Sequence, residues 1–156
     1  EDYIPYITRG NQTLFILDSD NIFADNKEQD RRFLLQTGSY NSNAYSLKYD
    51  IKLGQDGSDM VPGIRLSEMY YIMGEYFARK GEYSQAGKML DEVRYARGIL
   101  TTNMENSMEG FHTELLKDMR KEFVGEGQMF FQYKRMDKKP VDNAIFVFDK
   151  PDNEDI

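Results

Sequence analysis

The feature that most constrains the fold is a change of hydrophobic periodicity near residue 64 of this 156-residue chain. Before that point, apolar residues alternate with polar ones or form short runs between polar stretches. After it, they recur every three or four residues. Alternation is the period of a strand, and a spacing of three to four is the period of a helix. We therefore predict a mainly α protein with a few short strands and long loops.

The first part of the chain, residues 1–60, is predicted to be rich in loops. Thr13 to Leu17 (TLFIL) is an apolar run typical of a short buried strand. The acidic and polar stretch from Asp18 to Asp30 is predicted to be a loop. Between Tyr45 and Leu53 every second residue is apolar, as in a half-buried strand. Gly54 to Gly63 then has the composition of a turn-rich linker, which separates this part from the helices.

Residues 61–140 form the predicted helical core. A first helix runs to Lys80, with Gly81 as its C-terminal cap, and a second starts with Ser84 as its N-cap. Because the turn between them is short, the two helices should pack antiparallel. The first helix has an apolar stripe that we expect to face the core, made of Leu66, Met69, Tyr70, Met73, Tyr76 and Phe77. The corresponding stripe of the second helix is Ala86, Met89, Leu90, Val93 and Ala96.

Two further helices are predicted downstream. The third has its apolar residues at Phe111, Leu115, Met119 and Phe123. Gly125 and Gly127 interrupt the pattern, and Phe130 with Tyr133 resumes it as a short fourth helix. Residues 141–156 are predicted to be an extended tail, with an apolar run from Ala144 to Phe148 followed by acidic residues.

The first helical pair has the spacing of one tetratricopeptide repeat at its small and aromatic positions, namely Met73, Gly74, Tyr76, Gly81, Tyr83 and Ala86. Gly74 and Ala86 allow the two helices to approach closely, while Tyr76 and Tyr83 fill the elbow. The predicted fold class is therefore mainly α, with tetratricopeptide-like antiparallel helix pairs, a few short strands and long loops.

Charge and composition exclude several functions. The net charge is -7, which disfavours nucleic acid and anionic lipid headgroups as partners. The chain has no Cys, so disulfides, thiol catalysis and Cys-ligated metals are excluded. No apolar run is long enough to span a membrane. A neutral ligand such as a sugar is compatible with this composition. The chain begins with Glu1 rather than Met, which suggests a processed or excised part of a longer protein.

Residue types suited to catalysis are present but poorly arranged. His112 is the only His, and it has neither a Cys partner nor a nucleophile elbow. Glu122 and Glu126 lie four residues apart, on one face if the helix continues through Gly125. A glycosidase needs two carboxyl groups about 5–10 Å apart on opposite sides of a sugar, which this spacing does not supply. Pairing of both Glu residues with Arg65, Arg97 or Arg120 is the preferred interpretation.

No cofactor is predicted. Asp18, Ser19 and Asp20 begin like a calcium-binding loop, but Ile22 and Phe23 then occupy the positions where that loop needs an oxygen ligand and a Gly. We expect an acidic surface loop that takes calcium only incidentally, and no metal site.

A sugar site is the candidate binding site that the composition supports. Tyr40, Tyr45 and Tyr49 flank the turn Tyr40-Asn41-Ser42-Asn43. Sugars bind on aromatic faces beside amide and hydroxyl groups. Tyr45 and Tyr49 share the alternating apolar face, so we expect core packing for both. Tyr40 is therefore the candidate glycan-binding residue.

Residues 64–136 contain a series of motifs in order. Ile64 to Glu75 has an Arg-Leu-x-Glu opening and a Tyr-rich helix, Val93 to Gly98 has a Val-Arg-x-x-Arg-Gly ending, and Arg120 to Gln128 reads RKEFVGEGQ. Together they resemble the SusD/RagB-like family of outer-membrane nutrient-binding lipoproteins, C-terminal part. Met119, Met129 and Gln132 depart from the family pattern, in positions where it usually has Arg, Arg and Asp. Part of the family's ion-pair network is therefore expected to be replaced here by neutral or apolar contacts.

The resemblance implies a non-catalytic protein on the extracellular face of the outer membrane of Bacteroidetes-type bacteria. Such proteins bind oligosaccharides or polysaccharides for uptake by a SusC-like, TonB-dependent transporter. Membrane contact is expected only through a lipid anchor, and the Cys that carries this lipid in the family is absent from this chain. The motif positions are interpreted as a structural polar network of Arg65, Glu68, Glu75, Arg97, Glu122 and Glu126, because buried charges must be paired.

Two alternatives remain beside glycan capture. The first is a helical scaffold that docks the transporter without binding sugar itself. The second, with less support, is a glycoside hydrolase. An exposed aromatic platform beside polar groups would favour sugar binding, and opposed carboxylates in a cleft would favour hydrolysis.

Overall fold

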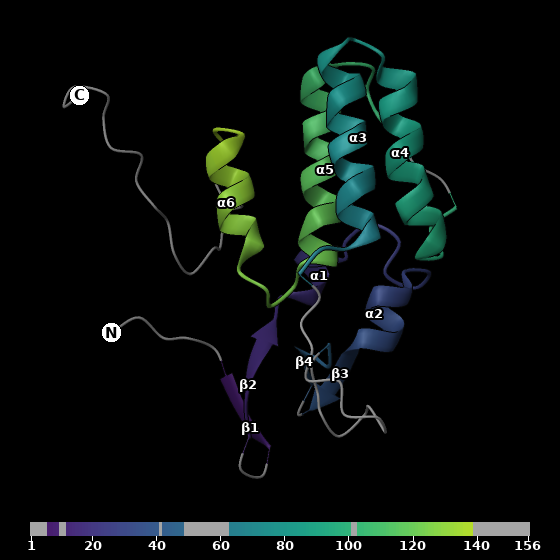
Figure 1. Ribbon diagram of the computed structural model, residues 1–156. Helices are drawn as coiled ribbons and strands as arrows, with labels where there is room; N and C mark the ends of the chain where they lie inside the picture. The colour runs from purple at the N-terminus through teal and green to yellow at the C-terminus, as the bar shows by residue number, and fades with distance from the viewer. Residues whose placement is uncertain (1–5, 10–11, 41, 49–62, 101–102, 139–156) are drawn as a thin grey trace, which may run out of the picture.

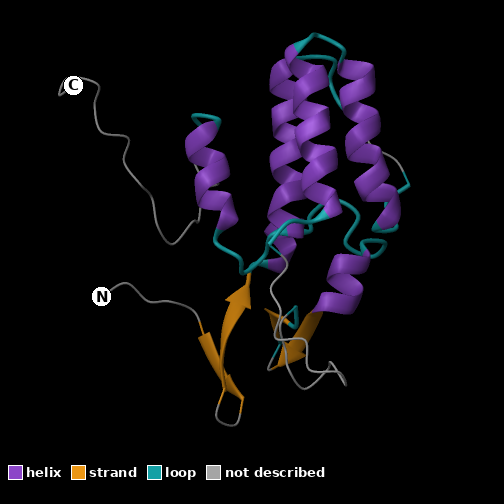
Figure 2. Ribbon diagram, in the orientation of Figure 1, coloured by secondary structure: helices purple, strands orange, loops and turns teal. Residues whose placement is uncertain are grey.

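The computed structural model describes residues 6–9, 12–40, 42–48, 63–100 and 103–138, and these are mainly helical, as predicted. Three long helices lie side by side, with a shorter fourth helix beside them and a small sheet beyond one end (Figures 1 and 2). The helices are α1 Ser19–Ile22, α2 Arg31–Gln36, α3 Leu66–Arg79, α4 Tyr83–Ala96, α5 Met108–Glu122 and α6 Gln128–Arg135. The strands are β1 Tyr6–Arg9, β2 Gln12–Leu17, β3 Thr37–Tyr40 and β4 Asn43–Ser46.

Helices α3 and α4 form the predicted antiparallel hairpin. Gly81 follows the C-cap of α3 with φ +78°, the left-handed conformation that a helix end commonly requires of Gly. Helix α4 then begins at Tyr83 with Glu82 at the N-cap, so the prediction of Ser84 as the cap was wrong. A Cβ on Gly74 would lie 3.1 Å from the Phe111 ring and 3.4 Å from the Ala86 carbonyl oxygen. Gly74 therefore sits where three helices meet.

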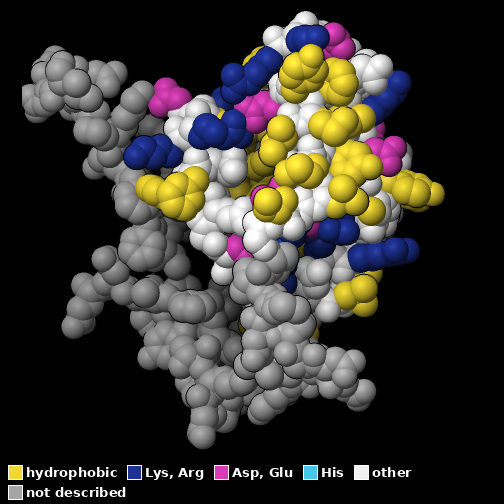
Figure 3. All heavy atoms as spheres, in the orientation of Figure 1, with side chains coloured by type: hydrophobic (Ala, Val, Ile, Leu, Met, Phe, Trp, Pro, Cys, Tyr) yellow, Lys and Arg dark blue, Asp and Glu magenta, His cyan; other side chains and the backbone are white. Residues whose placement is uncertain are grey.

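The orientation of α3 differs from the predicted one. Its most buried residues are Ser67, Tyr71, Gly74, Glu75 and Ala78. Of the expected stripe, Tyr70 and Phe77 pack against the core, but the other members are exposed, as is Ile72. The stripe was predicted to face inward because its side chains are large. The inward side of α3 instead combines the small residues Gly74 and Ala78 with Tyr71, and the exposed members of the stripe lie on the outward side, where hydrophobic side chains gather on the surface (Figure 3).

The core lies between α3, α4 and α5. Its buried apolar residues are Tyr71, Ala78, Ala86, Leu90, Val93, Phe111, Leu115, Met119 and Phe123. The stripes predicted for α4 and α5 contribute most of them. Met129 of α6 packs against this cluster, so both Met residues that depart from the family pattern make apolar contacts.

The sheet has the strand order β1-β2-β4-β3, with antiparallel neighbours. Strand β2 confirms the predicted Thr13–Leu17 strand. Strand β4 confirms only the start of the strand predicted from Tyr45, because it ends at Ser46. Leu47 and Lys48 are not part of a strand, so the prediction was wrong there, and residues 49–53 lie outside the described residues. Tyr45 is buried, as expected, and its ring covers its cross-strand partner Gly38, where a Cβ would lie 2.5 Å from the ring.

Two short helices replace part of the predicted loops. Helix α1 falls within the stretch Asp18 to Asp30, and α2 follows directly after it. With four and six residues, both are too short to show a periodic pattern. Among the described residues no helix is long and apolar enough to cross a membrane. The predicted extended run Ala144–Phe148 lies outside the described residues.

Candidate functional site

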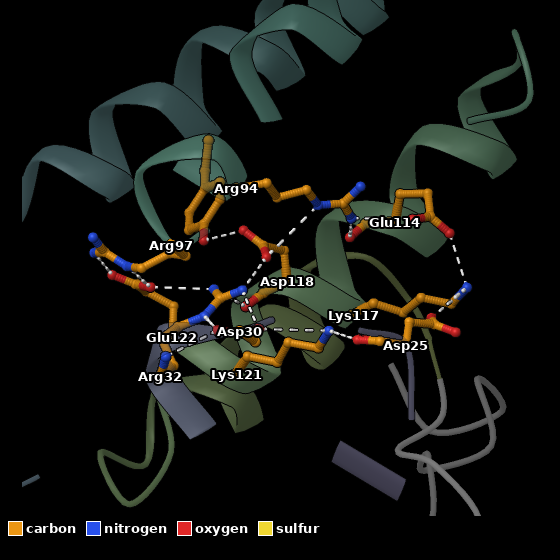
Figure 4. Close-up of polar contacts among 11 residues, drawn as sticks. Asp25, Asp30, Arg32, Arg94, Arg97, Glu114, Lys117, Asp118, Lys121 and Glu122 are labelled. Carbon is orange, nitrogen blue, oxygen red and sulfur yellow. Dashed lines mark hydrogen bonds and ion pairs between the residues drawn. The ribbon is translucent and has the colours of Figure 1, made fainter. Parts of the chain in front are cut away.

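The most unusual feature of the described structure is a buried cluster of charges around Arg32, where α2 meets α5 (Figure 4). It begins with a helix cap. The Asp30 side chain accepts a hydrogen bond from the Arg32 backbone N–H at 3.0 Å, which caps α2. The guanidinium of Arg32 then folds back and donates to both Asp30 oxygens, at 3.0 and 2.9 Å. Both side chains are almost completely inaccessible to water.

Helix α5 supplies the other carboxylates. Arg32 Nη2 lies 2.8 Å from Asp118 Oδ1, and Nη1 lies 3.3 Å from Glu122 Oε2. Asp118 and Glu122 are four residues apart and thus lie on the same face of α5. The hydroxyl of Tyr71 on α3 donates to Asp118 Oδ2 at 2.7 Å. The cluster therefore joins the chain around residue 32 to the helices.

Three further cations complete what we call the Arg32 cluster. Arg97 Nη2 lies 2.6 Å from Glu122 Oε1, and Arg94 bridges Asp118 at 3.7 Å and Glu114 at 3.0 Å. Lys121 lies 3.8 Å from Asp30. Cations and carboxylates thus alternate through the cluster, as seen in Figure 4, which is the condition under which buried charges are tolerated.

The pKa values show that the cluster holds its charges. Burial alone would raise the pKa of Glu122, but the hydrogen bond and charge of Arg97, together with Arg32, lower it to about 2. Burial lowers the pKa of Arg32, yet Asp118 and Asp30 outweigh this and raise it above its usual range. Burial, and then the charge of Asp118, raise the pKa of Tyr71. A general acid needs a carboxyl pKa raised towards neutrality, so Glu122 is unsuited to that role.

A second group of ion pairs involves Glu126. Arg65 Nη2 lies 2.6 Å from Glu126 Oε2, and Lys48 pairs with Oε1 of the same carboxylate. Arg65 also donates to the Glu122 carbonyl oxygen at 3.3 Å. Glu126 was expected to share a helix face with Glu122 if the helix continued, but α5 ends at Glu122 and Gly125 has φ +76°. Glu126 is therefore held from a turn rather than from the helix.

The two remaining motif residues, Glu75 and Glu68, differ in their surroundings. Glu75 accepts ion pairs from Arg79 at 2.7 Å and from Arg135 of α6 at 2.5 Å. Glu68 is not brought into this network. Its Oε1 atom is buried and has no hydrogen-bond partner among the described residues. Arg120, which was considered as a partner for the Glu residues, instead donates to Asn21 at 3.4–3.5 Å.

Tyr40, the candidate glycan residue, is the last residue of β3 and pairs with Asn43 of β4. The intervening Ser42 has φ +65°, as tight two-residue hairpin turns require. The predicted Asn-rich turn is thus a hairpin tip. The Tyr40 side chain lies outside the described structure, so its proposed role stays a prediction.

The start of the predicted acidic loop has structural roles instead. The Asp18 side chain caps α1, and Asp20 pairs with Lys27. Asp30, at the end of that stretch, is fully buried rather than on the surface. No group of three or more His, Cys, Asp or Glu side chains in the described ranges is arranged to hold a metal ion. His112 is half-buried near the start of α5, and burial lowers its pKa.

A small cavity lies beside the Arg32 cluster. Its volume accessible to a water molecule is about 10 Å³, room for about one water, and its lining includes Phe23, Arg32, Lys48 and Lys121. Pockets for organic ligands usually enclose roughly 300–1,000 Å³, so this one is too small for an oligosaccharide.

The sequence motifs did not predict the residues at the centre of the Arg32 cluster. Asp30, Arg32 and Asp118 belong to none of the quoted motifs, and Arg32 lies 86 residues from Asp118. One usable signal existed. Asp118 falls between Leu115 and Met119 in an otherwise apolar face of a predicted helix, and a carboxylate at such a position requires a buried cation.

Comparison with known proteins agrees with the motif pattern. No curated protein and no solved structure was found to match the chain. A sequence model of the SusD family, however, matches residues 7–152, which is nearly the whole chain. The match includes both the strands around residue 40 and the helices that carry the Arg32 cluster. The chain therefore belongs to the SusD family.

Proposed function

We propose that this chain is part of a cell-surface glycan-binding protein that captures oligosaccharides or polysaccharides for uptake by a SusC-like, TonB-dependent transporter. The observation that carries the proposal is the SusD family match over residues 7–152. Proteins of this family are generally binders associated with nutrient uptake at the cell surface. The proposed location is the extracellular face of the outer membrane, with attachment through a lipid anchor.

The arrangement of charges supports binding rather than catalysis. Glu122 and Glu126, the carboxylates that the hydrolase alternative requires, are both held by guanidinium groups. Glu122 has a pKa of about 2, so it stays ionised and does not donate a proton near neutral pH. The proposed role of both groups is to fix the chain around residues 32–48 against the helices.

Within this proposal the hairpin tip at Tyr40 is the sugar contact. A β-hairpin supports its tip rigidly through the register from Thr37↔Ser46 to Tyr40↔Asn43. The ring of Tyr40 supplies a stacking face, and the Asn side chains next to it supply amide groups for sugar hydroxyls. Tyr45 packs inward in β4 and serves the fold rather than the ligand.

The experiment is a glycan-array and affinity-gel screen of this chain, of Tyr40→Ala and of Tyr95→Ala. Tyr95 is an exposed Tyr on α4 and controls for the general loss of a surface ring. We expect glycan binding that Tyr40→Ala weakens about tenfold or more, the equivalent of about 1.4 kcal/mol, and that Tyr95→Ala leaves unchanged. Binding that both variants retain would exclude the hairpin as the site.

A second candidate function is a helical scaffold that docks the transporter without contacting sugar. The size of the cavity beside Arg32 favours it, because the described part of the chain offers there too little space for an oligosaccharide. The test is co-elution of the purified chain with a SusC-like transporter, with and without glycan. Co-elution without any glycan binding in the array would favour the scaffold, and glycan-dependent co-elution would favour capture.

A further inference from the structure

The hairpin of β3 and β4 is joined to the helices at both of its ends by charged side chains. At the entry, α2 passes directly into β3 between Gln36 and Thr37, and α2 is fixed by the Arg32 cluster. At the exit, Lys48 follows the end of β4 by two residues and reaches the end of α5. Both ends of the hairpin therefore meet the same part of the molecule, the C-terminal end of α5 and the turn after it (Figure 1).

Lys48 makes two contacts at the exit. Its Nζ atom pairs with Glu126 Oε1 and donates to the backbone carbonyl oxygen of Glu122. Only 13% of the Lys48 side chain and 4% of the Glu126 side chain are exposed, so salt screens this pair less than a surface pair. Glu126 is also held by Arg65, at 2.6 Å, just before α3. The group that Lys48 binds is therefore itself fixed to the helical core.

The hairpin has internal contacts that make it one unit. Its two strands pair over four residues each. The Leu47 N–H donates to the Gln36 carbonyl oxygen at 2.7 Å, which closes the base of the hairpin. Further along, the ring of Tyr45 covers Gly38 on the opposite strand. Because the hairpin keeps its own shape, any motion relative to the helices has to occur at its base.

Packing at this base is incomplete on the side that faces α5. The small cavity beside the Arg32 cluster lies there, and its lining includes Gln36, Thr37, Ser46 and Lys48 from the hairpin base and Lys121 and Val124 from α5 and the following turn. A void deprives the atoms around it of packing contacts, so polar contacts carry more of the attachment. Lys48 therefore bridges a side of the base that apolar packing leaves open.

We propose that Lys48 is a positioning residue that sets the direction of the β3–β4 hairpin relative to α5. With four residues per strand, the tip lies about 13 Å from the base, so a tilt of roughly 15° moves the tip by about 3 Å. A binding group has to be held within about 0.5 Å of its working position. Lys48 thereby also sets where Tyr40 meets a sugar, a second step that rests on the proposed function.

The two anchors of the hairpin have different roles. Arg32 at the entry is inaccessible to water and pairs with three carboxylates, so its loss disturbs the fold. Lys48 is partly accessible, and Glu126 keeps its pair with Arg65 when Lys48 is removed. Loss of Lys48 therefore leaves Glu126 with a cation, so the helices stay folded while the hairpin tilts.

The test measures the position of the hairpin in the whole chain with two spin labels on engineered Cys residues, because the chain has no Cys of its own. Ser39→Cys labels the hairpin and Thr113→Cys labels α5, and both positions are exposed. Pulsed electron paramagnetic resonance gives the distribution of distances between the labels. The distribution is compared in the parent chain, Lys48→Met, Lys48→Arg and Lys88→Met. Lys88 is an exposed Lys on α4 and controls for the loss of a positive charge.

Lys48→Met keeps most of the side-chain length but removes the charge. We expect it to shift the mean distance by about 3 Å or to broaden the distribution about twofold, while Lys48→Arg and Lys88→Met leave it unchanged. A second pair of labels, Glu92→Cys with Thr113→Cys, reports on α4 and α5 and should not change in any variant. An unchanged hairpin distance in Lys48→Met would overturn the proposal. A change in the helical pair would assign Lys48 to the stability of the core instead.

Glycan binding by the same variants is measured separately. If Tyr40 contacts the sugar, Lys48→Met should weaken binding about fivefold or more, and Lys48→Arg should restore most of the affinity. A tilted hairpin with unchanged affinity would confirm that Lys48 positions the hairpin and would overturn its role in sugar binding. Absence of glycan binding by the parent chain would contradict the proposed function, and the label distances would still decide whether Lys48 sets the direction of the hairpin.

Discussion

Two regions of the molecule reverse the usual distribution of side chains, namely the Arg32 cluster and the outer face of α3, by which we mean Leu66, Met69, Ile72, Met73 and Tyr76. Arg32 and Asp118 are inaccessible to water, while Leu66 and Ile72 of α3 are mostly exposed. The two regions differ in how narrowly they determine the packing of neighbouring elements. Buried charges tolerate few arrangements, so the cluster fixes how α2 meets α5. Apolar contacts are less directional, so the outer face of α3 specifies no single arrangement of what packs against it. The two regions should therefore respond differently to substitution, pH and apolar probes.

The largest expected effect comes from removing the central cation. Arg32→Met leaves Asp30, Asp118 and Glu122 buried with fewer partners, and breaking such a network costs about 3–5 kcal/mol. Urea or guanidinium denaturation measures the free energy of unfolding. The matched control is the neighbouring Arg31→Met, because Arg31 is exposed and its loss should cost less than about 0.5 kcal/mol. A loss below about 1 kcal/mol for Arg32→Met would mean that the cluster tolerates an apolar replacement.

Acid should weaken the same region. Glu122 has a pKa of about 2 in the folded chain and 4.5 ordinarily, so its contribution to stability is present above about pH 4.5. That contribution, about 3 kcal/mol from the pKa difference, is lost as the pH falls towards 2. Denaturation midpoints at pH 6, 5, 4 and 3 measure it. Glu122→Gln should be less stable at pH 6 and should show a flatter decline; an equally steep decline would assign the effect to other carboxylates.

The motif residues of the site could be predicted, whereas its centre could not. The pairs Arg97–Glu122 and Arg65–Glu126 follow from carboxylates that need cations and from the few Arg residues within the motifs. Arg32 lies outside those motifs, and apart from Asp30 its carboxylate partners Asp118 and Glu122 lie 86 and 90 residues away. Contacts between residues so far apart in sequence depend on how the helices and strands pack together. Hydrophobic periodicity carries no information about that packing.

The helices show the same limit. Their existence followed from a 3.6-residue period, but α3 has apolar residues on two sides, so the period alone could not decide which side is inward. Gly74 was the informative position. A Cβ there would lie 3.1 Å from Phe111, which shows that the close approach of the helices requires a small residue at this position. The inward side of α3 is therefore decided by Gly74 together with Tyr71, whose hydroxyl reaches the buried Asp118.

A smaller effect should distinguish the two sides of α3 directly. Tyr71→Phe removes the hydroxyl that donates to Asp118 at 2.7 Å and should cost about 1–2 kcal/mol, because a buried carboxylate loses a hydrogen bond. Tyr76→Phe removes the same atom from the outer face, where the side chain is half exposed, and should change the free energy of unfolding by less than about 0.5 kcal/mol. Equal losses from the two variants would contradict the contrast between the sides.

The smallest expected effect concerns the outer face itself. Ile72 is 62% exposed, so Ile72→Ser removes little buried surface from the helical core, and the free energy of unfolding should change by at most about 0.5 kcal/mol. The substitution should nevertheless reduce the binding of an apolar dye, because the outer face is a continuous apolar surface. A loss above about 2 kcal/mol would instead mean that Ile72 contributes to the core, which would contradict its exposure on the outer face of α3.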